Sequence, residues 1–384
     1  MCFPNQSDPI EKVTFKMKKA ILSLLTGVIL LSCASEQTIP SVVNVKEVST
    51  LTDATTNALV YSLPQTVIRV EVDVEKTISK VGPFYRYSQK MLNVTDVVTE
   101  DKEEWQIRGI RIQTVGKPDD DKRFNVAFSG NSAAPFLNLT DDGILAGINL
   151  QQVPVSESSL MDYSTEELPQ LKDVNFNNVS MLEKQLVKTS TAAMAEEAAN
   201  FIYKVRKRRF KILASDYETL PPDGQAWEVS VQELNQLETD FMQLFIGKRQ
   251  SYKTTQVFEV IAEPMAVNNT VLFRFSTLKG IVDKMNLSGT PVYVEVKVDN
   301  QKTLPDQPII DPKNKVVVRN GLYYCRPAKA TIKIIDRNIL LNQKEVYLAQ
   351  YGQLLSMPPE VLERDDVRIE LNPVTGALKS ISKE

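Results

Sequence analysis

The stretch from Leu63 to Thr77, LPQTVIRVEVDVEKT, decides the fold that the sequence predicts. Within it, aliphatic residues alternate with charged ones: Ile68, Val70, Val72 and Val74 with Arg69, Glu71, Asp73 and Glu75. A period of two residues places successive side chains on opposite faces of a strand. The stretch therefore predicts an antiparallel strand with one buried apolar face and one solvated charged face.

Comparable strand-like runs lie on both sides of this stretch. Up to residue 150 they are EWQIRGIRIQTVG (104–116), RFNVAFSG (123–130) and APFLNLTDDGILAGINL (134–150). After residue 251 they are KTTQVFEVIAEP (253–264), TVLFRFSTL (270–278), PVYVEVKVDN (291–300), LYYCRPAKATIKIID (322–336), KEVYLAQYG (344–352) and RIELNPVTGALKSIS (368–382). Gly109 predicts a bulge, whereas Asp142-Gly143 and Thr375-Gly376 predict hairpin turns.

Two helical patterns separate these groups of strands. The first, residues 190–216, places Met194, Ala198, Phe201, Ile202, Val205 and Ile212 on one stripe. The second, residues 227–247, does the same with Leu234, Leu237, Phe241, Leu244 and Phe245. LPPDG (220–224) forces a turn between them, and Gly247 suits a C-terminal cap, so we expect a helical hairpin.

The predicted fold class is α+β and mostly β. Two antiparallel strand-rich regions, with sandwich-like or curled sheets, are separated by the helical hairpin. The predicted divisions are 1–16 (an upstream extension assigned in error), 17–32 (signal peptide), 33–57 (flexible tether), 58–150 (β-rich domain), 151–186 (linker or long loop), 187–250 (helical hairpin) and 251–384 (β-rich domain).

The N-terminal segment MKKAILSLLTGVILLSC (17–33) has the parts of an export signal: a start, two lysines, an apolar run and a cysteine. The apolar run of about twelve residues is short for a transmembrane helix, which needs about 20. Its end, Leu30 to Cys33, resembles a bacterial lipobox. That resemblance implies cleavage after Ser32 and acylation of Cys33, so the expected partner is a membrane reached through lipid.

Two alternatives to lipidation stay open at this point: an ordinary cleaved signal followed by a coincidental cysteine, and an uncleaved anchor. With lipidation, the expected location is the cell envelope, as an outer-membrane lipoprotein on either its periplasmic or its surface face. Residues 1–16 precede a complete signal, so Cys2 would be absent from the mature chain.

Composition excludes several kinds of chemistry. The 384 residues include no histidine, which removes histidine-dependent triads and histidine metal ligands. Only three cysteines are present, too few for a four-thiolate zinc site, and no phosphate-binding loop appears. The net charge of −3 gives no indication of nucleic acid. Neither a cofactor nor a metal is expected, and the acidic run Asp119–Asp121 is interpreted as a solvated turn.

Several long phrases together resemble a family of Bacteroidetes-type lipoproteins that carries only a domain-of-unknown-function label. They are LPQTVIRVEVDVEKT, GPFYRYSQKMLNVTDVVTEDKEEWQIRGIRI, FIYKVRKRRFKILASD, LPPDGQAWEVSVQELNQLETDFMQLFIGK and LNPVTGALKSI. The resemblance spans about residues 58–384. It implies an exported, lipid-anchored protein and supplies no catalytic residue.

Two groups of residues are candidate binding sites. The aromatic group, Phe84, Tyr85, Tyr87 and Trp105, suits stacking against a glycan or contact with a peptide, although such residues are more often core. The basic group, Lys204, Arg206, Lys207, Arg208, Arg209 and Lys211, suits anionic headgroups or an acidic partner. Its alternative is a solvated face paired with glutamates such as Glu238.

The function that the sequence favours is a non-enzymatic binding or scaffolding protein with a glycan or an envelope protein as partner. The alternative is a histidine-free hydrolase that uses two carboxylates on glycans. These hypotheses predict different pockets, since a hydrolase needs converging carboxylates and a scaffold needs apolar patches.

Overall fold

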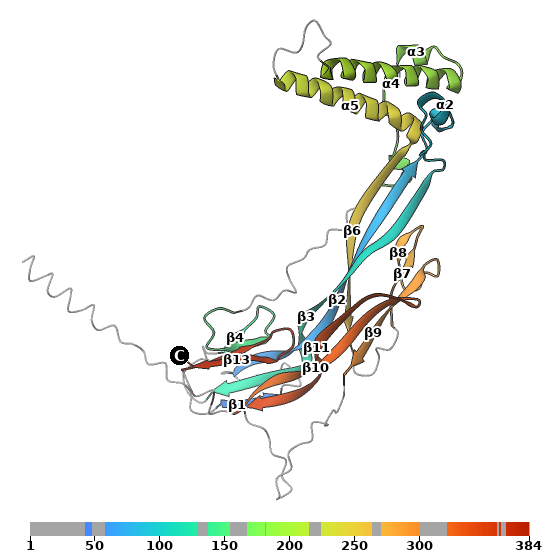
Figure 1. Cartoon of the computed structure of the whole chain (residues 1–384). Coiled ribbons are helices and arrows are strands. Elements are labelled where there is room, and N and C mark those ends of the chain that lie inside the picture. Colours follow the sequence, from blue (N-terminus) through green and yellow to red (C-terminus); the bar gives the residue numbers. More distant parts are fainter. Residues whose placement is uncertain are drawn as a thin grey trace, which may run out of the picture.

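A computed structural model describes residues 43–47, 58–128, 137–153, 167–180, 182–214, 224–262, 270–299, 321–358, 361 and 366–383. The molecule is elongated, with the long helices at one end and most of the strands toward the other (Figure 1). Across these ranges, the helices are either too short or too polar to cross a membrane.

Strands dominate the described residues. They are β1 (Val43–Glu47), β2 (Ala58–Lys80), β3 (Lys102–Phe128), β4 (Leu137–Leu139), β5 (Leu145–Ile148), β6 (Lys248–Ile261), β7 (Thr270–Ser276), β8 (Gly280–Val282), β9 (Thr290–Val298), β10 (Leu322–Asp336), β11 (Ile339–Met357), β12 (Val367–Leu371) and β13 (Leu378–Lys383). The helices are α2 (Ser88–Leu92), α3 (Glu183–Leu186), α4 (Thr191–Leu213) and α5 (Gly224–Ile246), with 3-10 turns η2 (Tyr85–Tyr87) and η4 (Leu171–Asp173).

The predicted strand around residue 70 lies inside β2, between β3 and β6. The first sheet has the order β1-β3-β2-β6, and its pairs are antiparallel. Pairing between β2 and β3 extends from Ala58 opposite Ala127 to Ser79 opposite Lys102. The three strands β2, β3 and β6 continue together beyond the other sheets and reach the helices (Figure 1).

Two bulges interrupt β3. The register shifts opposite Asp73 and Val74, next to Gly109, which confirms the predicted bulge. A larger shift separates Pro118 from Arg123, so residues 119–122 protrude from the strand. The predicted solvated turn at Asp119–Asp121 lies in this protrusion: Asp120 and Asp121 are exposed and the Asp121 amide donates to Asp119 Oδ1, although Asp119 itself is buried. β3 then resumes its pairing with β2 at Arg123.

Two apolar cores lie between the sheets. The aliphatic face of β2 packs against the second sheet, whose order is β11-β10-β9-β7-β8. Residues of this core include Ile68, Val70, Val72, Val74, Phe273, Val294, Ile332 and Leu348. A second core joins the other end of β2 to the third sheet, of order β13-β12-β5-β4, and includes Tyr61, Leu63, Phe124, Leu145, Leu322 and Ile369. Each such side chain contributes about 1.5–3 kcal/mol by leaving water.

The opposite face of β2 is charged, as predicted, but it is largely withdrawn from solvent. Glu71 is only 3% exposed, and Arg69 and Glu75 are buried as well. Side chains from the neighbouring strands cover them: Arg111 of β3 pairs with both Glu71 and Asp73. The predicted solvated face is thus wrong in its exposure, because long arginine and lysine side chains extend across a central strand.

Neighbouring side chains lower the pKa of two carboxyl groups, Asp73 on this face and Glu259 on β6. Burial alone would raise the pKa of Asp73, but hydrogen bonds from Thr255 and Arg111, and the charge of Arg111, lower that pKa below its ordinary value. Glu259 of β6 behaves in the same way, since burial is outweighed by Lys117 and Arg69 and its pKa is lowered. Asp73 and Glu259 thus keep their charge beside cationic partners, which is favourable because a charge withdrawn from water without a partner is costly.

The predicted α+β, mostly β class with antiparallel sheets is confirmed. The hairpins at Asp142-Gly143 and Thr375-Gly376 are present as β4–β5 and β12–β13. However, the two predicted β-rich regions share their sheets: β6 pairs with β2, and Ile369 of β12 pairs with Ile148 of β5. These contacts join residues at least 168 positions apart, as in the pair Lys80 and Lys248, and periodicity along the chain does not encode them.

The N-terminal predictions fall mostly outside the described residues. Residues 1–42 are not among them, so the signal peptide and the lipidation of Cys33 stay predictions. The LPPDG turn is also largely outside the described ranges. Cys325, by contrast, is buried in β10, with its Sγ 3.3 Å from the carbonyl oxygen of Ala349.

Candidate functional site

The helical end of the molecule, called the head here, comprises the described residues within 83–98 and 174–247. Helices α4 and α5 lie side by side across the end of β2, β3 and β6 (Figure 1). They bury the predicted stripes on each other, with the rings of Phe201 and Phe241 4.4 Å apart. Leu237 is the exception to its stripe, because it is 39% exposed.

The ends of these helices fix how the head joins the sheet. At the start of α4, the amide of Ala193 donates a hydrogen bond of 3.3 Å to Ser190 Oγ, which caps the helix. At the end of α5, Gly247 has φ +84° and its amide donates to the carbonyl of Gln243, as the predicted cap requires. A Cβ at Gly247 would lie 2.5 Å from Lys80 O, so the turn from α5 into β6 depends on glycine.

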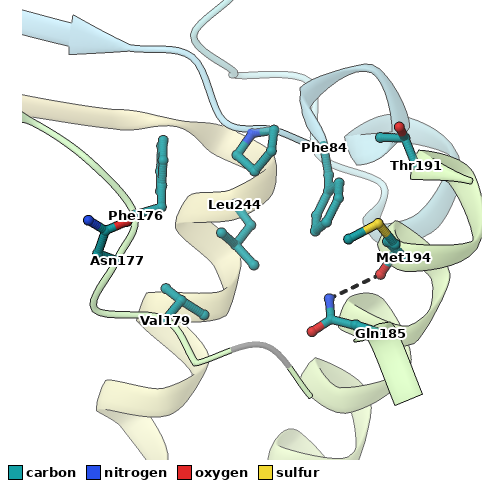
Figure 2. Close-up of a pocket in the computed structure, with 9 residues that line it drawn as sticks. Phe84, Phe176, Asn177, Val179, Gln185, Thr191, Met194 and Leu244 are labelled. Atoms are coloured by element: carbon teal, nitrogen blue, oxygen red, sulfur yellow. Dashed lines mark hydrogen bonds between the residues drawn. The ribbon is translucent and has the colours of Figure 1, made fainter. Parts of the chain in front are cut away.

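A pocket of about 520 Å³ opens at the base of the head. Its lining residues are Pro83, Phe84, Phe176, Asn177, Val179, Gln185, Thr191, Met194 and Leu244. Phe84 and Leu244 are buried and form its inner part, and Phe176 and Val179 contribute from the segment before α3 (Figure 2). Three segments that are distant in the sequence therefore meet around one apolar space.

The chemistry of this pocket suits an apolar group. Its buried polar side chain, Gln185, already has hydrogen-bond partners within the protein. The Gln185 Oε1 accepts from the Leu182 amide at 2.8 Å. The Gln185 Nε2 donates to Met194 O at 3.2 Å (Figure 2). Asn177 and Thr191 are exposed at the rim. The described residues that line it include no carboxylate, lysine or tyrosine, so they offer no general acid, general base or charged nucleophile.

The basic group of α4 divides into two sets. Arg206 Nε and Arg209 Nη1 both donate to the carboxylate of Glu238 on α5, the first at 2.6 Å. These two arginines therefore join the helices of the hairpin. Lys204, Lys207 and Arg208 are exposed and make no ion pair with the described residues, while Lys211 is half-buried.

Most of the chain matches a known protein family. Residues 57–379 match the family described as a domain of unknown function, DUF4831. The chain belongs to the DUF4831 family. No curated protein and no solved structure matches it. The resemblance to a family with a domain-of-unknown-function label is thus confirmed, while its lipoprotein character stays a prediction.

In the DUF4831 domain, three of the four candidate aromatic residues belong to two different cores. Phe84 is buried in the head, 5.5 Å from the ring of Phe245, and Tyr87 packs on the same core. Tyr85 is half-buried, and its hydroxyl accepts a hydrogen bond from Arg86. Trp105 packs instead on the core between the first and second sheets.

Of that aromatic group, the structure places Phe84 in the pocket and Trp105 well away from it in a different core. A Cβ at Gly280 would lie 2.8 Å from the Trp105 ring, so the indole is held tightly against β8. Glycan or peptide binding by the four residues stays a prediction. Of the four residues, Phe84 lines the pocket, where its neighbours differ from those that the sequence suggested.

Sequence reasoning missed two pocket residues in the DUF4831 domain, Phe176 and Val179. Both belong to a polar, aperiodic stretch that was interpreted as a linker or long loop. The available signal was their apolar character among asparagines in NFNNV (175–179). Met194 and Leu244 were assigned correctly to apolar stripes, but periodicity alone does not show that a stripe borders a space.

Proposed function

We propose that this DUF4831 protein is a lipid-anchored envelope protein that uses its head as a binding module at a distance from its anchored end. The observation that carries the proposal is the separation of the two ends: β1 lies at the opposite end of the molecule from α4 and α5 (Figure 1). β1 begins only ten positions after Cys33.

Chain dimensions support this arrangement. A segment of ten residues spans at most about 35 Å when fully extended. β2 alone has 23 residues, which correspond to about 75 Å of strand. A lipid on Cys33 would therefore hold the β1 end close to the membrane, and the head would be carried on β2, β3 and β6.

The pocket supports binding rather than hydrolysis. Glycoside hydrolysis requires two carboxylates across a cleft, and the lining of this pocket has none. An apolar pocket with a few polar groups at its rim is typical of a binding site for an apolar group. The pocket thus favours the scaffold hypothesis over the carboxylate hydrolase as the role of the head.

Substitution of Cys33 tests the anchor. Cys33→Ala is expected to abolish palmitate labelling and to move the protein from the membrane fraction to the soluble fraction, because the cysteine of the lipobox-like sequence would be missing. Cys2→Ala is the matched control and is expected to change neither result, since Cys2 precedes the signal. Retention of Cys33→Ala in the membrane fraction would contradict the anchor.

Site-specific photo-crosslinking in cells tests the binding module. A photoreactive residue at Thr191, exposed at the pocket rim, is expected to give a discrete crosslinked product. The same residue at Ser382, exposed on β13 at the other end, is the control and is expected to give none. The Thr191 product should disappear in the Cys33→Ala background. Equal products from both positions would contradict a head-specific role.

A further inference from the structure

The outer face of α4 is the strongest unassigned feature of the head. Arg206 and Arg209 are engaged by Glu238, whereas Lys204, Lys207 and Arg208 extend from the side of α4 that faces away from α5. These three side chains have no ionic partner within the described parts of the chain. We call Lys204, Lys207 and Arg208, together with Tyr203 and Phe210, the outer α4 face.

Exposed aromatic residues lie in the same stripe as the cations. Residues three, four and seven positions apart share one side of a helix, so Tyr203, Lys207 and Phe210 are aligned. Phe210 is 71% exposed, and Tyr203 is about half exposed, although its hydroxyl donates to Met91 O at 2.7 Å. A large apolar ring that remains in water one turn from exposed cations is unusual for a face whose only role is solvation.

Within the part of the chain that the structure describes, the acidic residues near this face do not neutralise it. Glu238 is held on the inner side by two arginines. Glu196 is exposed on α4, but it lies eight residues before Lys204, the nearest cation of this face, which corresponds to about 12 Å along the helix. That separation exceeds the Debye length of about 8 Å at physiological ionic strength. The outer α4 face is therefore locally positive on a chain whose net charge is −3.

We propose that the outer α4 face binds an anionic lipid surface. The cations are spread along a convex helix rather than converging on one point, which suits a layer of headgroups better than a single small anion. Phe210 and Tyr203 add the aromatic side chains that enter the interfacial region of a bilayer. Juxtaposed basic and aromatic side chains on one helix face are the usual composition of such surfaces.

This inference gives a ligand class to the head that the proposed function describes. It does not depend on acylation, because the face belongs to the polypeptide alone. A protein anchored at Cys33 and bound through the outer α4 face would contact lipid at two places, near β1 and at the opposite end of the molecule.

Vesicle sedimentation tests the inference with residues 34–384, which contain every described residue and lack the lipid. This chain is expected to sediment with vesicles of equal parts phosphatidylglycerol and phosphatidylcholine, and not with pure phosphatidylcholine. Salt should weaken the binding, because exposed charges are screened. The combined variant Lys204→Glu, Lys207→Glu and Arg208→Glu should bind about 100-fold more weakly, since each basic residue near an anionic surface contributes several-fold.

A matched variant controls for net charge. Lys90→Glu, Lys172→Glu and Lys184→Glu reverse three exposed lysines outside the outer α4 face, and this variant is expected to bind within about twofold of the unmodified chain. Phe210→Ser should weaken binding several-fold without changing its salt dependence. Circular dichroism spectra of all variants should match that of the unmodified chain, which checks that they are folded.

Three results would overturn the inference. One is that the unmodified chain fails to sediment with the anionic vesicles. Another is that both triple variants lose binding equally. The third is that the chain binds a soluble polyanion such as heparin but not the vesicles, which would assign the face to an acidic macromolecule. None of these results bears on palmitate labelling at Cys33, so the anchor and the lipid-binding face are tested separately.

Discussion

The head and the sheets of this protein are built from contacts of very different range. The core of the head joins α4 to α5, neighbours in the chain, and adds Phe84 and Leu92 from one short segment. The sheet cores join residues that are far apart, as in the hydrogen bond from the Tyr323 amide to the Tyr61 hydroxyl, 262 positions away. The three cores share no buried residue. The head therefore combines contacts between two neighbouring helices with a long-range contribution from Phe84 and Leu92, whereas the sheet cores join segments from much of the described chain.

The largest expected effect is a loss of stability caused by a substitution in the sheet core, which should affect the sheets and not the head. Phe273 of β7 is buried and stacks on Phe258 at a centroid distance of 4.9 Å. Phe273→Ala is expected to lower the free energy of unfolding by about 3–5 kcal/mol, because it removes a buried ring and leaves a cavity. Urea unfolding followed by circular dichroism measures the loss.

The matched control for this substitution is Phe210→Ala on α4, which changes the same side chain at an exposed position. It is expected to alter the free energy of unfolding by no more than about 0.5 kcal/mol. Hydrogen exchange should show faster exchange in β7 and β9 for Phe273→Ala, with α4 and α5 unchanged. Equal acceleration in the helices would contradict two separately stabilised parts.

A smaller effect is expected at the junction between the two parts. Gly247→Ala should destabilise the protein by about 1–3 kcal/mol, because Gly247 has positive φ and a Cβ would meet Lys80 O and the Val98 side chain. Gly224→Ala, at the start of α5, has open space around its Cβ and should be neutral or slightly stabilising. The difference between the unfolding free energies of the two variants measures the strain that a side chain introduces at position 247. Similar values for the two variants would argue against such strain.

The smallest expected effect is a change in the free energy of unfolding with pH. It comes from Asp73 on the charged face of β2 and from Glu259 on the neighbouring strand β6. The pKa values of Asp73 and Glu259 are lowered by their cationic partners from ordinary values of 3.8 and 4.5. Groups with a lowered pKa stabilise the fold above the ordinary pKa and lose that contribution as pH falls through the lowered one. The free energy of unfolding should therefore decrease between about pH 5 and about pH 3.

Glu259→Gln provides the control for this pH dependence. Glutamine does not titrate, so the variant should start less stable at neutral pH, since Arg69 and Lys117 lose a carboxylate partner. Its stability should then fall less steeply in acid than that of the unmodified protein. A slope identical to the unmodified one would show that Glu259 makes no contribution.

Much of the secondary structure could be predicted because it depends on local patterns. Alternation around Val72 predicted β2, Gly247 predicted the end of α5, and Asp142-Gly143 predicted the β4–β5 hairpin. The candidate site was harder to predict from local patterns. The basic run on α4 was visible, but its division into paired arginines and exposed lysines depends on where Glu238 lies on the neighbouring helix.

The sequence by itself determined the mostly β class, the helical hairpin and the absence of histidine chemistry, because each follows from residue type and spacing along the chain. Tertiary structure alone decided that β6 joins β2, that Glu71 is buried beneath Arg111, and that Phe84, Phe176 and Met194 enclose a pocket. The physical reason is that burial and pairing belong to the space between segments. One segment's periodicity specifies which face is apolar, but not which distant segment covers it.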